Sequence, residues 1–186
     1  MKKVIASERE LWEGCCRQNR QAQHDLFVRF LPVMFGICRR YSKSKMDAED
    51  LVQDGFMVVF REIKSLQNGS LEGWMRRIFI NLCIDRFRKD SRRQTWLLPE
   101  SGENLDVAEP SNPSLFDFLE EEKLVELINQ LPEGARIAFN LHAVEGYSHA
   151  EIAVIMNISE STSRVQVAKA RRILQEKLSH LKEIKK

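Results

Sequence analysis

The sequence predicts an all-α protein built from two small helical domains that a flexible acidic linker joins. Apolar residues recur at helical spacing over most of the 186 residues, and no run alternates as a half-buried strand does. The periodicity lapses between about Trp96 and Ser114, where three prolines and many acidic residues accumulate. The predicted domains therefore cover residues 5–95 and 115–186, with the linker at residues 96–114.

The composition is that of a folded, water-soluble chain. Hydrophobic residues make up 43% and charged residues 30%, which allows a buried core and excludes a generally disordered chain. The opening MKKVIASERE lacks the apolar core of a signal peptide, and no run approaches the roughly 18 apolar residues of a membrane span. We therefore expect a cytoplasmic protein without membrane insertion.

The net charge of +2 conceals an uneven distribution of charge along the chain. Between Pro99 and Glu126, nine acidic residues stand against one base, Lys123. From Ser161 to the end, eight lysines and arginines stand against two glutamates. This asymmetry indicates a nucleic-acid partner for the basic parts and a spacer role for the acidic part.

Residue types that bind metals or catalyse reactions form no coherent group. The four cysteines make no CxxC pair and lie near no spaced histidine, so we expect no zinc site, no other metal or cofactor, and no disulfide framework. Cys38 and Cys83 fall within apolar helical patterns and are interpreted as small buried hydrophobes. His142 and His149 are interpreted as local structural or surface residues. Without a Gly-rich phosphate loop or a catalytic constellation, an enzyme is not expected.

Two helices open the predicted first domain. Ser7 and Glu10 make a capping-box pattern, so a helix begins there with Leu11, Trp12 and Cys15 turned inward. The second helix carries an apolar series that passes through a proline, which we expect to kink or split it. The series is Leu26, Phe27, Phe30, Met34, Ile37, Cys38 and Tyr41, and the proline is Pro32.

The third predicted helix opens at Asp47 and has two distinct faces. Its apolar side chains recur at spacings of three and four. They are Val52, Phe56, Val59, Phe60 and Ile63. The polar side chains grouped on the other face are Glu49, Asp50, Gln53 and Asp54.

A turn-like segment, Gln67 to Ser70, precedes a fourth helix that is apolar on one side and basic on the other. The predicted apolar stripe is Leu71, Trp74, Met75, Ile78 and Leu82. The basic residues are Arg76, Arg77, Arg86, Arg88 and Lys89, followed by Arg92 and Arg93.

The predicted second domain begins with a helix that turns at Pro132 and a second helix that stops at Gly146. Its apolar residues are Leu124, Leu127, Ile128, Leu131, Ile137, Ala138 and Leu141. Ser148 and Glu151 then make another capping box, which starts a short helix. Its apolar face is Ile152, Ala153, Ile155 and Met156.

This short helix, the turn at 157–159 and a longer basic helix from Glu160 together form a predicted helix-turn-helix. Its inward stripe is Ser163, Val167, Ala170 and Leu174, and Arg164, Gln166, Lys169 and Arg172 project elsewhere. Arg164 can reach guanine O6 and N7, and Gln166 can pair with adenine, while Lys169 and Arg171 can hold phosphate. Taken alone, the same pattern also fits a solvated charged face on a bundle helix.

Several long motifs in order resemble those of the extracytoplasmic-function (ECF) sigma factors, the smallest class of the sigma-70 family. They are LFVRFLP at 26–32, CRRY at 38–41, DAEDLVQDGF at 47–56 with VVFREI after it, WMRRIFINLCID at 74–85, LPEGARIAFNLHAVEGYSHAEIAVIMNIS at 131–159 and AKARRIL at 168–174. The resemblance covers nearly the whole chain apart from the linker and the tails.

The resemblance implies a first domain, region 2, that binds a coiled coil of the largest subunit of core RNA polymerase and recognises the opened −10 element. It implies a second, region 4, that reads the −35 element as duplex and contacts the polymerase flap. An anti-sigma factor is a further partner that the family implies. The residues implied for polymerase binding are Glu49, Asp50, Gln53 and Asp54.

For the promoter, the resemblance implies two groups of residues. At the −10 element, the loop from Leu66 to Ser70 covers a flipped base through Leu66, Gln67 and Asn68. Asn81 lines the pocket that receives this base. The residues that track phosphate there are Arg76, Arg77, Arg86 and Arg88. The −35 residues are Thr162, Arg164, Gln166, Lys169 and Arg171. Trp74 could pass for a base-stacking platform, but its place on the apolar stripe favours core packing.

This sequence departs from many relatives at two places. Leu66 and Gln67 stand where relatives have Phe-Arg, and the loop is about a residue shorter, so the −10 base preference is not transferred. Many relatives carry Val directly after the equivalent of Thr162 and Ser three residues after it, whereas this chain has Ser163 and Val165 at these positions. The fold is expected to survive that exchange, whereas the −35 contacts are not transferred.

Other interpretations stay open from the sequence. A conventional transcription regulator would combine the helix-turn-helix with an N-terminal effector or dimerisation domain and bind duplex DNA without polymerase. A helical protein-interaction module would explain the amphipathic faces but not two basic helices separated by an acidic spacer. In the sigma family the linker passes through polymerase channels that nucleic acid also uses, and a generic solvated spacer explains its composition nearly as well.

Overall fold

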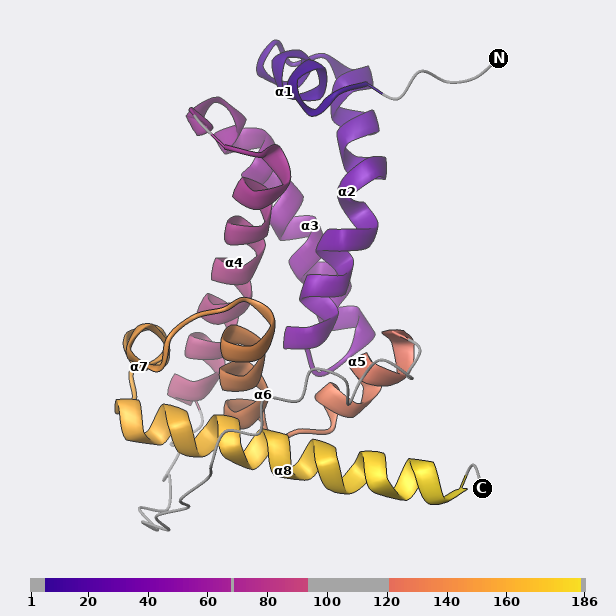
Figure 1. The fold of residues 1–186 in the computed structure, drawn as a ribbon. Coiled ribbons are helices and arrows are strands. Elements are labelled where there is room, and N and C mark those ends of the chain that lie inside the picture. Colours follow the sequence, from indigo (N-terminus) through magenta and orange to yellow (C-terminus); the bar gives the residue numbers. More distant parts are fainter. Residues whose placement is uncertain (1–5, 68, 94–120, 185–186) are drawn as a thin grey trace. The chain divides into compact units, whose positions relative to one another are not determined.

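A computed structural model of the chain describes residues 6–67, 69–93 and 121–184 (Figure 1). Within these residues every regular element is a helix, so the predicted all-α class is confirmed. The chain divides into two compact units, Met1–Arg86 and Phe87–Lys186. The predicted linker at 96–114 lies outside the described residues, and the predicted domain limits stay predictions.

The first unit begins with α1 (Glu8–Cys16) and α2 (Arg20–Tyr41). The capping box of Ser7 and Glu10 is formed as predicted. Pro32 does not split α2, which runs through it as a single helix. Because Pro32 is exposed, water can satisfy the carbonyl that lacks its helical N–H partner.

The third helix, α3 (Lys45–Glu62), begins two residues before the predicted start at Asp47. Its N-cap is Ser44, whose Oγ accepts a hydrogen bond from the Asp47 N–H at 3.1 Å and donates one to Asp47 Oδ2 at 2.6 Å. Asp47 therefore lies in the first turn, where a carboxylate stabilises the positive end of the helix. A short 3-10 turn, η1 (Ile63–Ser65), follows α3.

The fourth helix, α4 (Leu71–Arg93), buries a different face from the predicted stripe. Leu71 and Met75 are buried as predicted, whereas Trp74, Ile78 and Leu82 are half-buried. The buried residues that the prediction missed are Phe79, Ile80, Cys83 and Ile84. The cause is the contact of Phe79 with α3, where its ring packs edge-to-face on Phe56 with the ring centroids 5.4 Å apart.

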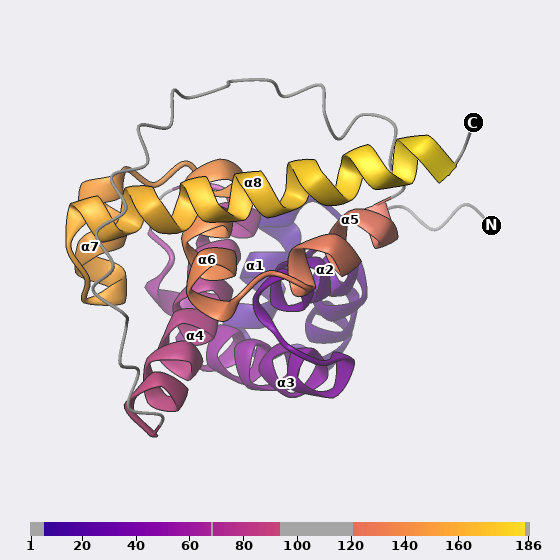
Figure 2. The ribbon, with the colours of Figure 1, turned by 90° about the horizontal axis from the view of Figure 1, so that it is seen from below.

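Besides the end of α4, the described residues of the second unit form four helices and a π-helical segment. They are α5 (Glu121–Asn129), α6 (Glu133–Phe139), η3 (Asn140–Val144, π-helical), α7 (His149–Met156) and α8 (Glu160–Ile184). Helices α5, α6 and α7 pack on α8 (Figure 2). One buried cluster joins α5 and α6 to α8 through Leu127, Ile128, Leu131, Ala135, Phe139, Ala170, Leu174 and Leu178.

Candidate functional site

An apolar hollow lies between α2 and α3 on the first unit. Its apolar lining is Phe27, Val52, Phe56, Met57 and Phe60, and Glu49 and Gln53 complete it. The rings of Phe27 and Phe56 are 4.7 Å apart, and the Met57 side chain, 64% exposed, stands open to solvent. An exposed apolar patch beside polar side chains is typical of a protein-binding surface.

The residues predicted to bind polymerase lie on this part of α3. Glu49, Asp50, Gln53 and Asp54 are all exposed, and two of them, Glu49 and Gln53, line the hollow. Met57 was not among the residues predicted for this surface. Its spacing of four from Gln53, and of eight from Glu49, could have placed it on the same helical stripe.

The loop between η1 and α4 carries three of the residues predicted for the −10 element. Leu66 is half-buried and Gln67 is exposed, while Asn68 lies outside the described residues. Gly69 has φ +104°, a backbone conformation that residues with a side chain rarely adopt. Ser70 ends the loop, and its Oγ accepts a hydrogen bond from the Gly73 N–H at 2.9 Å, which caps the start of α4.

The polar side of α4 presents the remaining −10 candidates. Arg77, Asn81 and Arg86 are exposed, whereas Arg76 and Arg88 are half-buried. Arg76 lies 3.5 Å from the Glu72 carboxylate and Arg86 lies 3.9 Å from the Asp47 carboxylate. Arg77 and Asn81 are one turn apart, so a cation and an amide are offered together on one exposed face.

The turn of the helix-turn-helix lies where the sequence predicts it. Asn157 takes the left-handed conformation that ends α7, with φ 55°, and an Asn tolerates this conformation well. Ser159 Oγ accepts from the Thr162 N–H at 3.0 Å and lies 2.7 Å from the Thr162 hydroxyl. Thr162 is therefore engaged in the cap of α8.

Two stacked histidines link η3 to α7, and one of them also contacts α8. The rings of His142 and His149 stack with centroids 4.3 Å apart. His149 Nδ1 lies 3.0 Å from the hydroxyl of Ser163, which is fully buried, and His142 Nδ1 lies 2.9 Å from the Tyr147 carbonyl oxygen. The structural interpretation of both histidines is thus the correct one of the two that the sequence left open.

The inward stripe of α8 is buried as predicted, at Ser163, Val167, Ala170 and Leu174. Four of the five predicted −35 residues divide into two groups around the outer face. Because residues seven apart differ by only about 20° on a helix, Arg164 aligns with Arg171 and Thr162 with Lys169.

Between these groups, the face opposite the buried stripe carries Val165, 38% exposed, and the exposed Arg172. Sequence reasoning had not assigned Val165 to a site. An apolar side chain there can contact a thymine methyl in the major groove.

Gln166 is half-buried and turned toward α6. A Cβ added to Gly134 of α6 would lie 3.6 Å from Gln166 Oε1. Arg164, by contrast, is exposed at the start of α8 and forms an ion pair with Glu160. Of the two residues predicted to read bases, Arg164 is therefore the one presented outward.

Two family models match the chain in the order of its two units. The model of Sigma-70 region 2 matches residues 26–93, and the model of Sigma-70, region 4, matches residues 121–174. The chain belongs to the sigma-70 family. In its terms, region 2 takes in most of α2 with α3 and α4, and region 4 takes in α5, α6, α7 and the first part of α8.

Curated relatives place the chain in the ECF class of this family. It is 31% identical over 147 residues to the ECF RNA polymerase sigma factor SigE of Mycolicibacterium smegmatis, a match that covers 78% of this chain and 57% of the length of that protein. It is 29% identical to the ECF RNA polymerase sigma-E factor of Haemophilus influenzae over 94% of this chain and 97% of that protein.

Two solved structures have a similar fold. CnrH in complex with the cytosolic domain of CnrY has a TM-score of 0.50 at 21% identity, covering 93% of this chain and 97% of that chain. The sigma factor RpoE of Bartonella quintana, in complex with the anti-sigma factor NepR, has a TM-score of 0.50 at 26% identity, covering 84% of this chain and 96% of that chain.

In the described part of this sigma-70 chain, no helix is both long and apolar enough to cross a membrane.

Proposed function

We propose that this chain is an ECF sigma factor that binds core RNA polymerase, directs it to specific promoters and assists promoter opening. The observation that carries the proposal is the succession of a region 2 and a region 4 in one chain. A conventional regulator explains the helix-turn-helix but gives no reason for a region 2 before it. The chain would act in the cytoplasm with the polymerase, as an initiation factor without catalytic activity of its own.

The surface proposed for core polymerase combines the hollow with the acidic side of α3. Phe27 and Met57 supply apolar area, and Glu49 and Gln53 supply polar groups at its edge. A helix of a coiled coil presents apolar and charged side chains in this mixture, and burial of the apolar part would provide most of the affinity. Asp50 and Asp54 would steer basic groups of the partner.

The surface proposed for the −10 element is the loop from Leu66 to Ser70 with the polar side of α4. Unpaired DNA is held by groups that track its phosphates and by a pocket that accepts an unstacked base. Arg77 and Asn81 are exposed side by side on α4, and Arg76, Arg86 and Arg88 add positive charge along the same helix. We assign phosphate contacts to the arginines and the flipped base to Asn81 and the loop, including Asn68.

The surface proposed for the −35 element is the outer face of α8, inserted into the major groove. Arg164 would contact bases there, and Lys169 and Arg171 would hold phosphates on either side. Thr162 and Gln166 would act at the edge of this contact. Thr162 is already engaged by Ser159 in the cap of α8, and Gln166 lies beside Gly134 of α6.

An anti-sigma factor is the second protein partner that we propose. The relative RpoE of Bartonella quintana has been solved with one. A partner that covered the hollow between α2 and α3 would exclude core polymerase by direct competition.

Run-off transcription on fragments of the source genome tests the proposed function. Core polymerase with the purified chain should yield discrete transcripts from a small set of promoters, and core polymerase alone should not. Transcript patterns that are the same with and without the chain would refute the proposal. The promoters recovered would also provide the −10 and −35 sequences for the variants below.

A further inference from the structure

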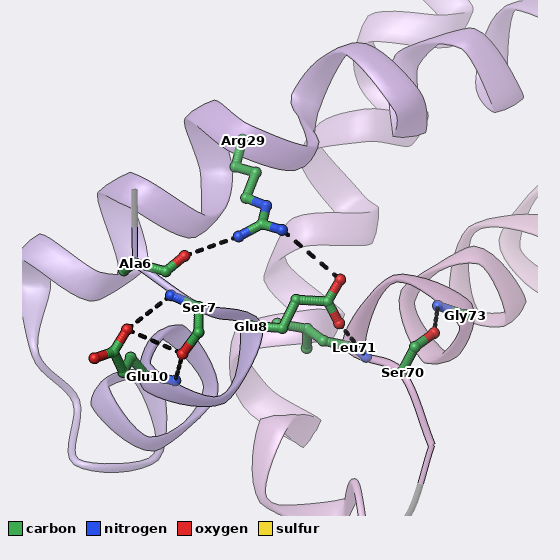
Figure 3. A network of polar contacts seen from close by, with 8 residues as sticks. All are labelled: Ala6, Ser7, Glu8, Glu10, Arg29, Ser70, Leu71 and Gly73. Carbon is green, nitrogen blue, oxygen red and sulfur yellow. Dashed lines mark hydrogen bonds and ion pairs between the residues drawn. The ribbon is translucent and has the colours of Figure 1, made fainter. Parts of the chain in front are cut away.

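Helix α1 holds both ends of the loop proposed to read the −10 base. Before the loop, the indole Nε1 of Trp12 donates a hydrogen bond to the carbonyl oxygen of Ile63 at 3.0 Å. After the loop, the carboxylate of Glu8 accepts a hydrogen bond from the Leu71 N–H at 3.0 Å (Figure 3). Glu8 and Trp12 are one turn apart on α1, so a single rigid helix spans the two ends.

The contact of Glu8 is suited to hold the start of α4. Leu71 is the first residue of α4, and its N–H is one of the donors that a helix leaves without an intrahelical partner. A carboxylate at this point also stabilises the positive end of the helix. Ser70 caps the same turn through Gly73, so the side chain of Glu8 adds a second and non-local restraint.

The carboxylate of Glu8 is itself held in place from α2. Arg29 Nη2 lies 3.9 Å from Glu8 Oε1, and Arg29 Nη1 donates a hydrogen bond to the Ala6 carbonyl oxygen at 2.9 Å (Figure 3). One oxygen of Glu8 thus faces Arg29 and the other faces Leu71. The restraint runs from α2 through Glu8 to the end of the loop.

Helix α1 is also anchored by apolar side chains. Leu11 and Cys15 are the buried residues of α1, at 3% and 2% exposure, and they anchor the helix by apolar burial. Glu8 and Trp12 are half-buried, and their polar atoms contact residues that bound the loop.

We propose that α1 is a positioning element for the −10 loop, in which Glu8 and Trp12 set the separation and orientation of the loop ends and thereby its base selectivity. The matched region 2 starts at residue 26, so this control comes from a helix outside it. The inference rests on the proposed function, since it requires that the loop from Leu66 to Ser70 contacts the −10 base.

The test compares open-complex formation by holoenzymes that carry Glu8→Ala, Glu8→Gln, Trp12→Phe or the control Glu13→Gln. Glu13 lies on the same helix and pairs with Arg9 at 3.0 Å and Arg17 at 3.8 Å. Promoters with single substitutions at each −10 and −35 position serve as templates. Loss of one hydrogen bond should reduce −10 discrimination about 3- to 10-fold for Glu8→Ala and Trp12→Phe.

The same variants should keep core affinity and −35 discrimination, and Glu8→Gln, which retains an acceptor oxygen, should recover part of the −10 selectivity. In the free protein, amide exchange at Leu71 should be faster in Glu8→Ala, a readout that needs no transcription. Unchanged −10 discrimination in both Glu8→Ala and Trp12→Phe would overturn the inference, as would an equal loss in Glu13→Gln. A wild-type holoenzyme without −10 dependence would instead overturn the proposed function, and the inference with it.

Discussion

Gly55 of α3 lies directly against the ring of Phe79 of α4. A Cβ added to Gly55 would be 2.4 Å from Cε1 and 2.5 Å from Cζ of that ring, which is fully buried. No methyl group fits there unless the helices separate or the ring leaves its place. The glycine therefore leaves room for the Phe79 ring against α3, behind the surface proposed for core polymerase.

Gly55→Ala should lower the free energy of unfolding of the first unit by about 1–3 kcal/mol, the usual cost of an overpacked core. Urea unfolding followed by circular dichroism measures this change. Gly36→Ala is the matched control in α2, where the nearest atom to a new Cβ is Arg40 Nη1 at 4.0 Å. Gly36→Ala should stabilise by about 0.4–1 kcal/mol, and equal stability of the two variants would contradict the close packing.

Arg164→Ala should relax base preference at one position of the −35 element, at a cost of about 1–3 kcal/mol for a bidentate contact with guanine. Holoenzyme binding to promoters substituted at each −35 position measures the preference. Arg172→Ala is the control, because Arg172 also pairs with a glutamate four residues away, Glu176 at 3.6 Å. Arg172→Ala should weaken all promoters alike, and the same uniform loss in Arg164→Ala would reassign Arg164 to phosphate.

The carboxyl group of Glu151 should titrate below its ordinary pKa. The backbone N–H of Ser148, and then its hydroxyl, donate hydrogen bonds to this carboxylate and lower its pKa. A lowered folded-state pKa contributes stability that is present above the ordinary pKa of a glutamate and is lost as the pH falls through the folded pKa.

Nuclear magnetic resonance titration of Glu151 checks this assignment. Ser148→Ala removes the hydroxyl donor, so the pKa of Glu151 should rise toward its ordinary value and part of the acid sensitivity of α7 should disappear. An unshifted pKa in the wild-type protein would show that the capping box is not formed in solution.

The helix-turn-helix was predictable because its signals are local. The capping box of Ser148 and Glu151 and the turn at 157–159 each depend on a few neighbouring residues, although the left-handed conformation of Asn157 was not predicted. The same kind of signal, Ser44 three residues before Asp47, was present at the start of α3 and was overlooked. Contacts between distant segments were harder to foresee.

The buried face of α4 depends on a glycine in another helix, Gly55, which receives Phe79. Periodicity within α4 alone favours Trp74 and Ile78 over Phe79 as buried residues. The predicted apolar face of α4 therefore differs from the face that is buried in the structure. The hollow raises the same difficulty, because it needs Phe27 of α2 beside Met57 of α3. The four polar residues of α3 could be chosen from one helix, but their apolar partner surface could not.

The affinity of the chain for core RNA polymerase tests the central claim most directly. Titration of fluorescently labelled chain with core enzyme should show saturable binding, with Met57→Glu weakening it at least tenfold because a charge would enter the apolar surface. Met46→Glu is the matched control, since Met46 is 70% exposed on the same helix and does not line the hollow; it should bind as the wild type does. Absence of any association between the wild-type chain and core polymerase would contradict the account.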